Sequence, residues 1–283
     1  VSLVSFGQLG TDIVYNFNFY RTGGEEITNT WYRWKLPGTL EHQFFDENTY
    51  NTVVKSGNNY YLTSFRVAQS SSQGFIELES GSKTNLCLDM WYNEPIVEYD
   101  SATDQSTILY PYEPLQGTTP VLVVYGDSTN ETITTFDENT TQHIKITGNY
   151  VGKKMVLGYQ YDMSIELPRF YVVQAGGEGR FDADTTSQLI IHRLKVKTGL
   201  SGSVDYKVKI LGITDRTQTI TALQANRYLL NSVNLTEGAT HILPLYQRNN
   251  NLSVTIEGKT PYPVTVESLN WEGRYASNFY RRV

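Results

Sequence analysis

The stretch Val204-Asp205-Tyr206-Lys207-Val208-Lys209-Ile210 decides the fold class of this chain. Its apolar residues occupy every second position, and charged residues fill the positions between them. Successive side chains of a β-strand point to opposite faces of a sheet, so this pattern predicts a strand with one buried face and one solvated face. A helix would instead require apolar residues three or four positions apart.

The same alternation recurs along the chain, in residues 15–19, 161–167, 252–257 and 264–266. Clusters of Gly, Asn and Ser separate these segments, as is typical of turns. We predict one antiparallel hairpin between 190–197 and 204–210, joined by the loop Gly199–Gly202. We predict a second hairpin between 252–257 and 263–269, joined by Gly258-Lys259-Thr260-Pro261. Thr221–Leu230 is the segment most like a helix, but its apolar spacing is too loose to predict one.

These patterns predict an all-β protein made of antiparallel sheets. We divide the chain into residues 1–95, a propeller-like blade region; 96–185, a small β domain or insertion; and 186–283, a C-terminal antiparallel β domain. The expected architecture is the end of a β-propeller-like domain followed by small sandwich-like or barrel-like domains. One repeat supports blade-like units, because Phe45-Asp46-Glu47-Asn48-Thr49 recurs as Phe136-Asp137-Glu138-Asn139-Thr140.

Composition excludes several classes of protein. The formal net charge of −6 disfavours binding to nucleic acid through its phosphates. No run of about 18 apolar residues is present, so we expect no membrane-spanning helix. The single cysteine, Cys87, lies in an apolar run and is interpreted as a small buried hydrophobic residue. No signal peptide is visible. The first five residues resemble the middle of a strand, so we expect this chain to be a fragment of a longer polypeptide.

The sequence offers little for catalysis, and we expect no catalytic residue, cofactor or metal. The four histidines are far apart: His42, His143, His192 and His241. Gly199-Leu200-Ser201-Gly202-Ser203 lacks the second glycine of a nucleophile elbow. Asp182–Ser187 begins like a calcium loop but lacks its glycine and its terminal glutamate. Glu77 and Glu79 would share one strand face, and a glycan hydrolase therefore stays open as an alternative.

The aromatic run Trp31-Tyr32-Arg33-Trp34 permits a second alternative, a carbohydrate-binding adhesin. On a strand, Trp31 and Arg33 would face one way, and Tyr32 and Trp34 the other. At least one of these pairs is therefore expected in a core. A shallow aromatic platform without an opposing acid would favour an adhesin, whereas two carboxylates across an aromatic cleft would favour a hydrolase.

Two motifs resemble the tail tubular protein B family, the nozzle of short-tailed, T7-like bacteriophages. The first is Trp31–Gly38, which contains Trp31, Arg33, Trp34, Pro37 and Gly38. The second is the C-terminal set Trp271-Glu272-Gly273, Tyr275 and Arg281-Arg282-Val283. Members of that family are much longer, so the resemblance is to their C-terminal portion.

This resemblance implies a structural virion protein located in the phage tail, with no catalytic role. It implies a homohexameric ring, an adaptor ring protein and tail fibres as partners, and a channel through which double-stranded DNA leaves without sequence-specific binding. We expect Trp271 to lie in a core. We expect Arg281 and Arg282 at a protein contact, because a basic wall would retain passing DNA.

Overall fold

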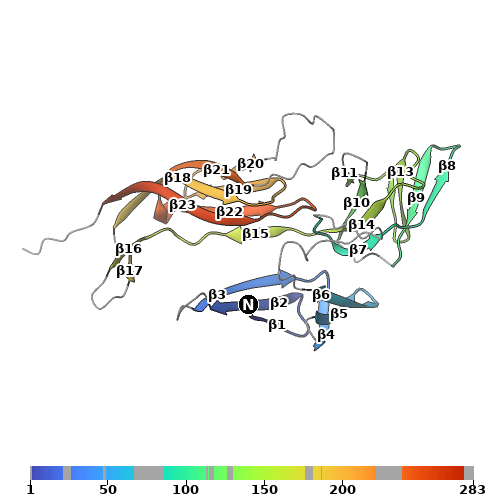
Figure 1. Ribbon diagram of the computed structural model, residues 1–283, viewed down its shortest axis with the longest axis horizontal. Helices are drawn as coiled ribbons and strands as arrows, with labels where there is room; N and C mark the ends of the chain where they lie inside the picture. Colours follow the sequence, from blue (N-terminus) through green and yellow to red (C-terminus); the bar gives the residue numbers. More distant parts are fainter. Residues whose placement is uncertain are drawn as a thin grey trace, which may run out of the picture. The chain divides into compact units, whose positions relative to one another are not determined.

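The computed structural model describes residues 2–21, 27–46, 49–66, 86–112, 114, 118–125, 130–175, 181–185, 187–220 and 238–276. The chain forms two compact units. The first comprises Val1–Thr84, Asp89–Tyr125 and Ile133–Tyr159, and the second comprises Asn85–Leu88, Gly126–Thr132 and Gln160–Val283. Both units consist of β-strands (Figure 1).

The all-β prediction is confirmed for the described residues, which form small antiparallel sheets and one 3₁₀ turn, η2 (Asn249–Asn251). These sheets form neither a propeller nor a closed barrel. Thr221–Leu230, the segment most like a helix, lies outside the described residues. Polar and turn-forming residues separate the strands. The predicted segments 15–19, 204–210 and 252–257 lie in strands, 161–167 does so in part, and 264–266 precedes β23 except for Val266.

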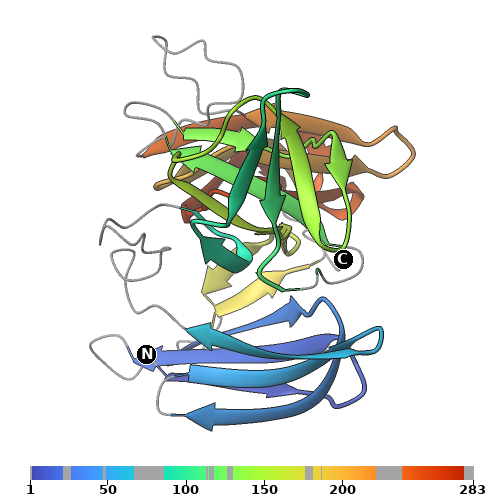
Figure 2. The same cartoon turned by 90° about the vertical axis from the view of Figure 1, so that its right-hand side faces the viewer.

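The first unit begins with two three-stranded sheets whose strands follow each other in chain order. The first sheet is β1 (Ser2–Gly7), β2 (Ile13–Arg21) and β3 (Ile27–Lys35). The second is β4 (Thr39–Asp46), β5 (Thr49–Ser56) and β6 (Asn59–Arg66). They share a core of Val14, Leu36, Leu40, Tyr50 and Val54, with Trp34 and Phe65 packed against it. Figure 2 shows the strands of both sheets together, in blue.

Two further four-stranded sheets surround one core, and most of their residues belong to the first unit. One sheet has the order β11 (Asn130–Ile133), β10 (Thr119–Tyr125), β14 (Met155–Gln160) and β7 (Asp89–Asn93). The other has the order β12 (Glu138–Asn139), β13 (His143–Thr147), β9 (Gln105–Leu109) and β8 (Val97–Asp100). Buried residues from both sheets meet in one cluster: Ile108, Leu122, Val124, Ile144, Ile146, Met155 and Leu157.

The second unit also contains two sheets with a shared core. One has the order β15 (Met163–Glu166), β22 (Leu252–Gly258), β19 (Val204–Ile210) and β20 (Arg216–Ile220). The other has the order β21 (Ala239–Arg248), β18 (Gln188–Thr198) and β23 (Val266–Ala276). A separate hairpin pairs β16 (Val172–Ala175) with β17 (Phe181–Asp184). The shared core includes Leu194, Tyr206, Leu243 and Ile256, all fully buried.

Both predicted hairpins are wrong, although their strands exist. Strand β18 pairs with β21 and β23, whereas β19 pairs with β20 and β22. The loop at Gly199–Gly202 therefore crosses from one sheet to the other, and the loop after Gly258 does the same between β22 and β23. This crossing lets the apolar faces of consecutive strands pack against each other across the core, which a hairpin within one sheet does not allow.

The two crossing loops support each other through hydrogen bonds. The backbone N–H of Gly199 donates to the Thr265 carbonyl at 3.0 Å, and that of Gly202 donates to the Pro263 carbonyl at 3.0 Å. Ser201 accepts a bond from the Thr265 N–H at 3.0 Å through its hydroxyl oxygen. These bonds satisfy backbone groups that the sheets leave unpaired at this end of the unit.

The repeated Phe-Asp-Glu-Asn-Thr segments do not occupy equivalent positions. In the first copy, Asp46 pairs with Thr49 across the tip of the β4–β5 hairpin. In the second copy, Glu138 and Asn139 are themselves strand β12, and the turn follows at Thr140. The following strands differ as well, since β5 pairs with β6 whereas β13 pairs with β9. The predicted duplication is therefore not reproduced in the pairing of strands.

Candidate assembly surfaces

The C-terminal motif is held in strand β23 against the core of the second unit. Trp271, Gly273 and Tyr275 alternate along the strand, and the two aromatic side chains pack against the core cluster. Trp271 is thus partly buried against this core. Gly273 lies at a close approach of β23 to β18, because a Cβ added there would be 2.2 Å from the Ile190 carbonyl oxygen. The pairing register shifts beside it, between Ile191 and Arg193.

Glu272 lies between two cations of the neighbouring strand β18. Its carboxylate forms ion pairs with Lys195 and Arg193. The hydrogen bonds from Lys195 and Arg193 hold the pKa of Glu272 below its ordinary value. All three side chains are at least a third exposed, so solvent screens the pairs and their contribution to stability is small. Their main effect is to keep β23 in register on β18.

Tyr275 belongs to a polar cluster that sequence reasoning missed. Its hydroxyl donates to Asp184 Oδ2 at 2.6 Å, and the backbone N–H of Ser187 donates to Asp184 Oδ1 at 3.0 Å. Asp184 thus links the end of β17 to the C-terminal end of strand β23. The segment Asp182–Ser187, which lacks the glycine and the glutamate of a calcium loop, contains the hydrogen bond between Ser187 and Asp184. Arg281 and Arg282, predicted at a protein contact, lie outside the described residues.

The Trp31–Trp34 run alternates as predicted. Trp31 and Arg33 are exposed, whereas Tyr32 and Trp34 are half-buried. The Trp34 ring stacks on Phe65 with centroids 4.9 Å apart and packs on the core between the two three-stranded sheets. The two tryptophans of this motif therefore have different surroundings, one in a core and one in solvent.

Pro37 and Gly38 form the loop that carries the chain from one three-stranded sheet to the other. A Cβ at Gly38 would lie 2.4 Å from the Lys55 carbonyl oxygen and 2.9 Å from the Val54 side chain. The loop therefore packs directly on β5, and only glycine fits there. Hydrogen bonds from Leu36 N–H to Asp12 and from Leu40 N–H to Thr11, both 2.7 Å long, fix its two ends.

Trp31 is part of an exposed group of aromatic side chains on the sheet β1-β2-β3. The Phe6 and Tyr15 rings stack at 5.7 Å between centroids, and the Phe17 and Trp31 rings lie 4.6 Å apart. Trp31 is 61% exposed and Phe6 44%. We call Phe6, Tyr15, Phe17 and Trp31 the aromatic face. The alternation of Tyr15 and Phe17 with Asn16 was the sequence signal for it.

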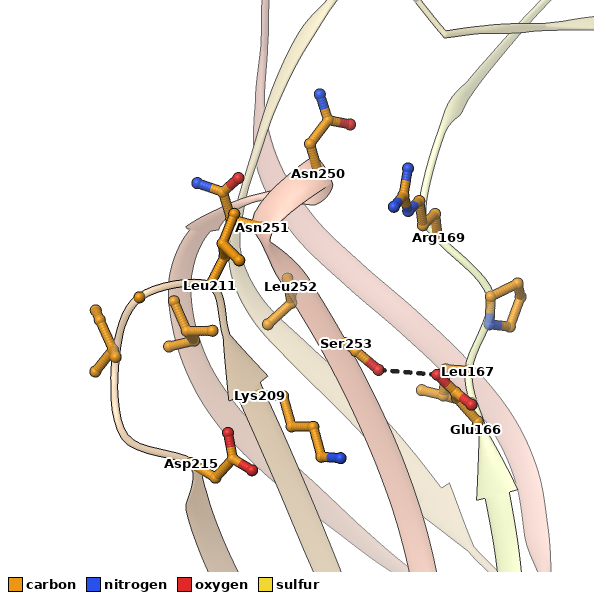
Figure 3. Close-up of a pocket in the computed structure, with 14 residues that line it drawn as sticks. Glu166, Leu167, Arg169, Lys209, Leu211, Asp215, Asn250, Asn251, Leu252 and Ser253 are labelled. Atoms are coloured by element: carbon orange, nitrogen blue, oxygen red, sulfur yellow. Dashed lines mark hydrogen bonds between the residues drawn. The ribbon is translucent and has the colours of Figure 1, made fainter.

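One groove lies in the second unit, beside the turn between β19 and β20 (Figure 3). It measures about 890 Å³ and is open to solvent. Leu211 and Ile213 on its rim are 79% and 59% exposed, and Glu166 accepts a hydrogen bond from Ser253 at 3.2 Å. Its charged lining is mixed: Glu166, Arg169, Lys209 and Asp215.

Among the described residues, this groove contains no pair of carboxylates facing each other across an aromatic cleft. Glu166 and Asp215 come from different ends of it in Figure 3 and flank no aromatic cleft. Among the described residues, no three His, Cys, Asp or Glu side chains group together as metal ligands. Glu77 and Glu79, the pair considered for glycan hydrolysis, lie outside the described residues.

Comparison with protein families matches residues 2–282 to the bacteriophage nozzle protein family. The chain belongs to the bacteriophage nozzle protein family. The resemblance inferred from the two motifs is thereby confirmed, and the family places this chain among structural proteins of the phage tail. No curated protein matches the chain. Among the described residues of this nozzle-family chain, no helix is both long and apolar enough to cross a membrane.

His241 in the second unit of this nozzle-family chain is partly buried, and its burial makes stability depend on pH. His241 Nδ1 lies 2.6 Å from the hydroxyl of the buried Tyr206, and burial lowers the pKa of His241. The unfolded chain binds a proton at His241 near its ordinary pKa of about 6.5. Its contribution to stability is therefore fully present above that pH and is lost as the pH falls below it.

We expect His241→Gln to reduce the acid sensitivity of the second unit. Between pH 7 and 5, the wild-type free energy of unfolding should fall more steeply than that of the variant, by at most about 1.4 kcal/mol per pH unit. Urea unfolding at several pH values measures both slopes. Tyr206→Phe should retain the wild-type slope, because burial of His241 is unchanged. Equal slopes for wild type and His241→Gln would contradict this prediction.

Proposed function

We propose that this chain is a structural part of the tail nozzle of a short-tailed phage, in a ring around the channel through which the genome leaves. The match to the nozzle family over residues 2–282 is the observation that carries this proposal. The resemblance of the two motifs adds a homohexamer, contacts with an adaptor ring and tail fibres, and passage of double-stranded DNA. The role is mechanical and requires no catalytic residue or cofactor.

The charge of the chain supports a channel that does not retain DNA. Double-stranded DNA carries about one negative charge per 1.7 Å of its axis, and proteins bind it by placing Lys and Arg on its phosphates. A chain with a net charge of −6 repels DNA at short range. We therefore propose acidic loops toward the channel and the C-terminal arginines toward protein.

Three core clusters support the proposed division of the chain into three structural regions. They lie within the proposed regions 1–95, 96–185 and 186–283, apart from Leu167, Phe170 and Val172, which precede residue 186 and pack with the last cluster. We propose that the two sheets β1-β2-β3 and β4-β5-β6 are propeller-like blades, since each is an antiparallel meander in chain order and they pack through one core. The two following regions then form sandwich-like domains.

Electron microscopy of the purified protein tests the proposed ring. Class averages should show closed rings with a central channel, and six-fold averages would identify the hexamer. Particles that remain single chains at every concentration tested, and that do not join purified adaptor protein, would overturn the proposal. Labelling of intact virions with an antibody to this chain should mark the tail.

Replacing Arg281 and Arg282 together by Ala should weaken ring assembly, because both charges would lose carboxylate partners across a protein contact. The affinity for DNA at moderate salt should stay the same. Sedimentation measures assembly, and fluorescence anisotropy with a labelled duplex measures DNA binding. The matched control is Lys153→Ala with Lys154→Ala, which removes two neighbouring cations elsewhere. Intact rings with altered DNA binding would show that the arginines face the channel.

A further inference from the structure

One side of the sheet β21-β18-β23 carries an excess of positive charge. Core residues of β18 alternate with the residues on this side, which faces away from the core of the second unit. Its charged residues, among those described, are five cations and two carboxylates: Arg193, Lys195, Lys197, Arg248, Arg274, Glu267 and Glu272. The chain as a whole has a net charge of −6, so this side, which we call the cationic side, is an exception.

Ion pairs within the sheet occupy three of the five cations. Glu272 pairs with two cations of β18, and Glu267 pairs with Lys197 at 2.7 Å. The side chains of Arg248 and Arg274 are exposed and form no ion pair or hydrogen bond with the described residues. The cationic side therefore has two arginines available for an anion from another molecule.

These two arginines flank one residue of the central strand. Ile190 lies opposite Arg248 on β21 and opposite Arg274 on β23. Residues opposite each other in neighbouring strands share a face, and two strand spacings place the backbones of the two arginines about 10 Å apart. Asp184, near the end of β23, is bonded to Tyr275, whose ring is on the core side of the strand. The arginines thus form two forks for planar anions around an apolar floor.

Tyr246 lies beside the arginines in a strained backbone conformation. Strand β21 places two residues, Leu245 and Tyr246, opposite His192, and this is a β-bulge. The φ of Tyr246 is +50°, which bulky residues rarely adopt and glycine adopts readily. The bulge turns the ring outward, where it stacks on His192 with centroids 5.6 Å apart and is 70% exposed.

This strain serves no packing need of the core. Leu245, the other residue of the bulge, is buried in the core cluster, whereas Tyr246 is not part of it. Strained backbone conformations cluster at functional sites, and tyrosine and arginine are enriched among the residues that dominate binding between proteins. The strained tyrosine and the two unpaired arginines therefore indicate the same function, recognition of a partner.

We propose that Arg248, Ile190, Arg274 and Tyr246 form a docking site for an acidic segment of a partner protein. Two Asp or Glu side chains of the segment pair with the two arginines, and an apolar side chain between them lies on Ile190 and the Tyr246 ring. The family match assigns no such surface. The site lies within the second unit and needs no assembled ring, so it goes beyond the proposed nozzle function.

The surroundings of the docking site favour a protein segment over DNA or an acidic polysaccharide. The carboxylates of Glu267 and Glu272 stand on the same side and repel an extended run of phosphates. A short acidic segment avoids them, because it needs only two anchoring charges. Ile242, 50% exposed on the same side, continues the apolar surface, and only the protein segment has apolar side chains to cover it.

Fluorescence anisotropy with a labelled acidic peptide, Glu residues around one central Leu, tests the docking site. Wild type should bind the peptide at low salt and release it as salt screens the charges. Arg248→Ala and Arg274→Ala should each weaken binding at least about 10-fold, as expected for loss of a charge-assisted hydrogen bond. The matched controls are Lys55→Ala and Tyr60→Ala, a cation and an exposed tyrosine 5.5 Å apart in the first unit, which should bind normally.

The variant Tyr246→Gly separates binding from folding. Glycine relieves the strained φ, so the unfolding temperature of the second unit should stay the same or rise. Binding of the peptide should nevertheless fall about 5-fold or more, because the exposed ring is lost. A lower unfolding temperature would show that the ring serves the fold, and would overturn its place in the docking site.

Three further outcomes would overturn the proposal. The first is wild type that does not bind the peptide at low salt, and the second is equal losses in the arginine variants and the controls. The third is tighter binding of duplex DNA or of oligogalacturonate, lost in the same arginine variants, which would assign the site to phosphates or to a polysaccharide. Wild type that forms rings but fails these tests leaves the nozzle function intact, and peptide binding by a chain that forms no ring leaves this inference intact.

Discussion

Replacing Gly273 by Val is expected to lower the free energy of unfolding of the second unit by roughly 2–4 kcal/mol, because overpacking and displaced strand pairing add to each other. The Cβ would lie 2.2 Å from the Ile190 carbonyl oxygen and 3.2 Å from the Ile191 Cα, so β23 must move away from β18. That movement also strains the ion pairs of Glu272. Urea unfolding followed by circular dichroism measures the loss.

The control for this prediction is Gly212→Ala. Gly212 has a φ of +80° with no atom within 4 Å of an added Cβ, so its replacement brings backbone strain without a clash. A residue with a side chain pays about 1–2 kcal/mol in this conformation. Equal losses for the two variants would show that the close approach of β23 to β18 contributes nothing beyond conformational strain.

Replacing Tyr206 by Ala should be as damaging, with an expected loss of about 3–5 kcal/mol. Tyr206 is fully buried in the centre of the core between the two sheets of the second unit. Burial raises the pKa of its hydroxyl to about 12. Removal of the ring leaves a cavity that neighbouring strands on both sheets cannot fill. Differential scanning calorimetry measures the loss as a lower transition temperature of this unit.

The variant Tyr206→Phe separates the ring from its hydroxyl. It retains the packing but leaves His241 Nδ1 without the hydroxyl that lies 2.6 Å away. The expected loss is about 1 kcal/mol, as for a typical hydrogen bond. If Tyr206→Phe cost as much as Tyr206→Ala, the hydrogen bond to His241, and not core packing, would dominate at this position.

Both predictions concern residues that hold the two sheets of the second unit together, and this bears on the role of the family motif. Trp271, Gly273 and Tyr275 act within the fold, through core packing, close strand approach and the hydrogen bond to Asp184. The motif therefore fixes the last described strand in place ahead of the C-terminal arginines.

The sequence by itself determined the strands, their buried faces and the family. Alternation at Val204–Ile210 predicted strand β19 with Val204, Tyr206 and Val208 inside, and all three are buried. The same reasoning separated exposed Trp31 from half-buried Trp34. This works because the period of side chains along a strand depends on local backbone geometry alone.

Only the tertiary structure decided which strands pair. The loop at Gly199–Gly202 is compatible with a hairpin, yet β18 and β19 lie in different sheets. Alternation shows that a strand has an apolar face. It does not show whether the next strand in the chain pairs beside it in the same sheet or lies in the sheet across the core, because that depends on which arrangement buries the apolar faces of both strands. The register shift at Ile191/Arg193 and the Asp184–Tyr275 bond arise in the same way. They join residues far apart in the chain, where no local pattern records the contact.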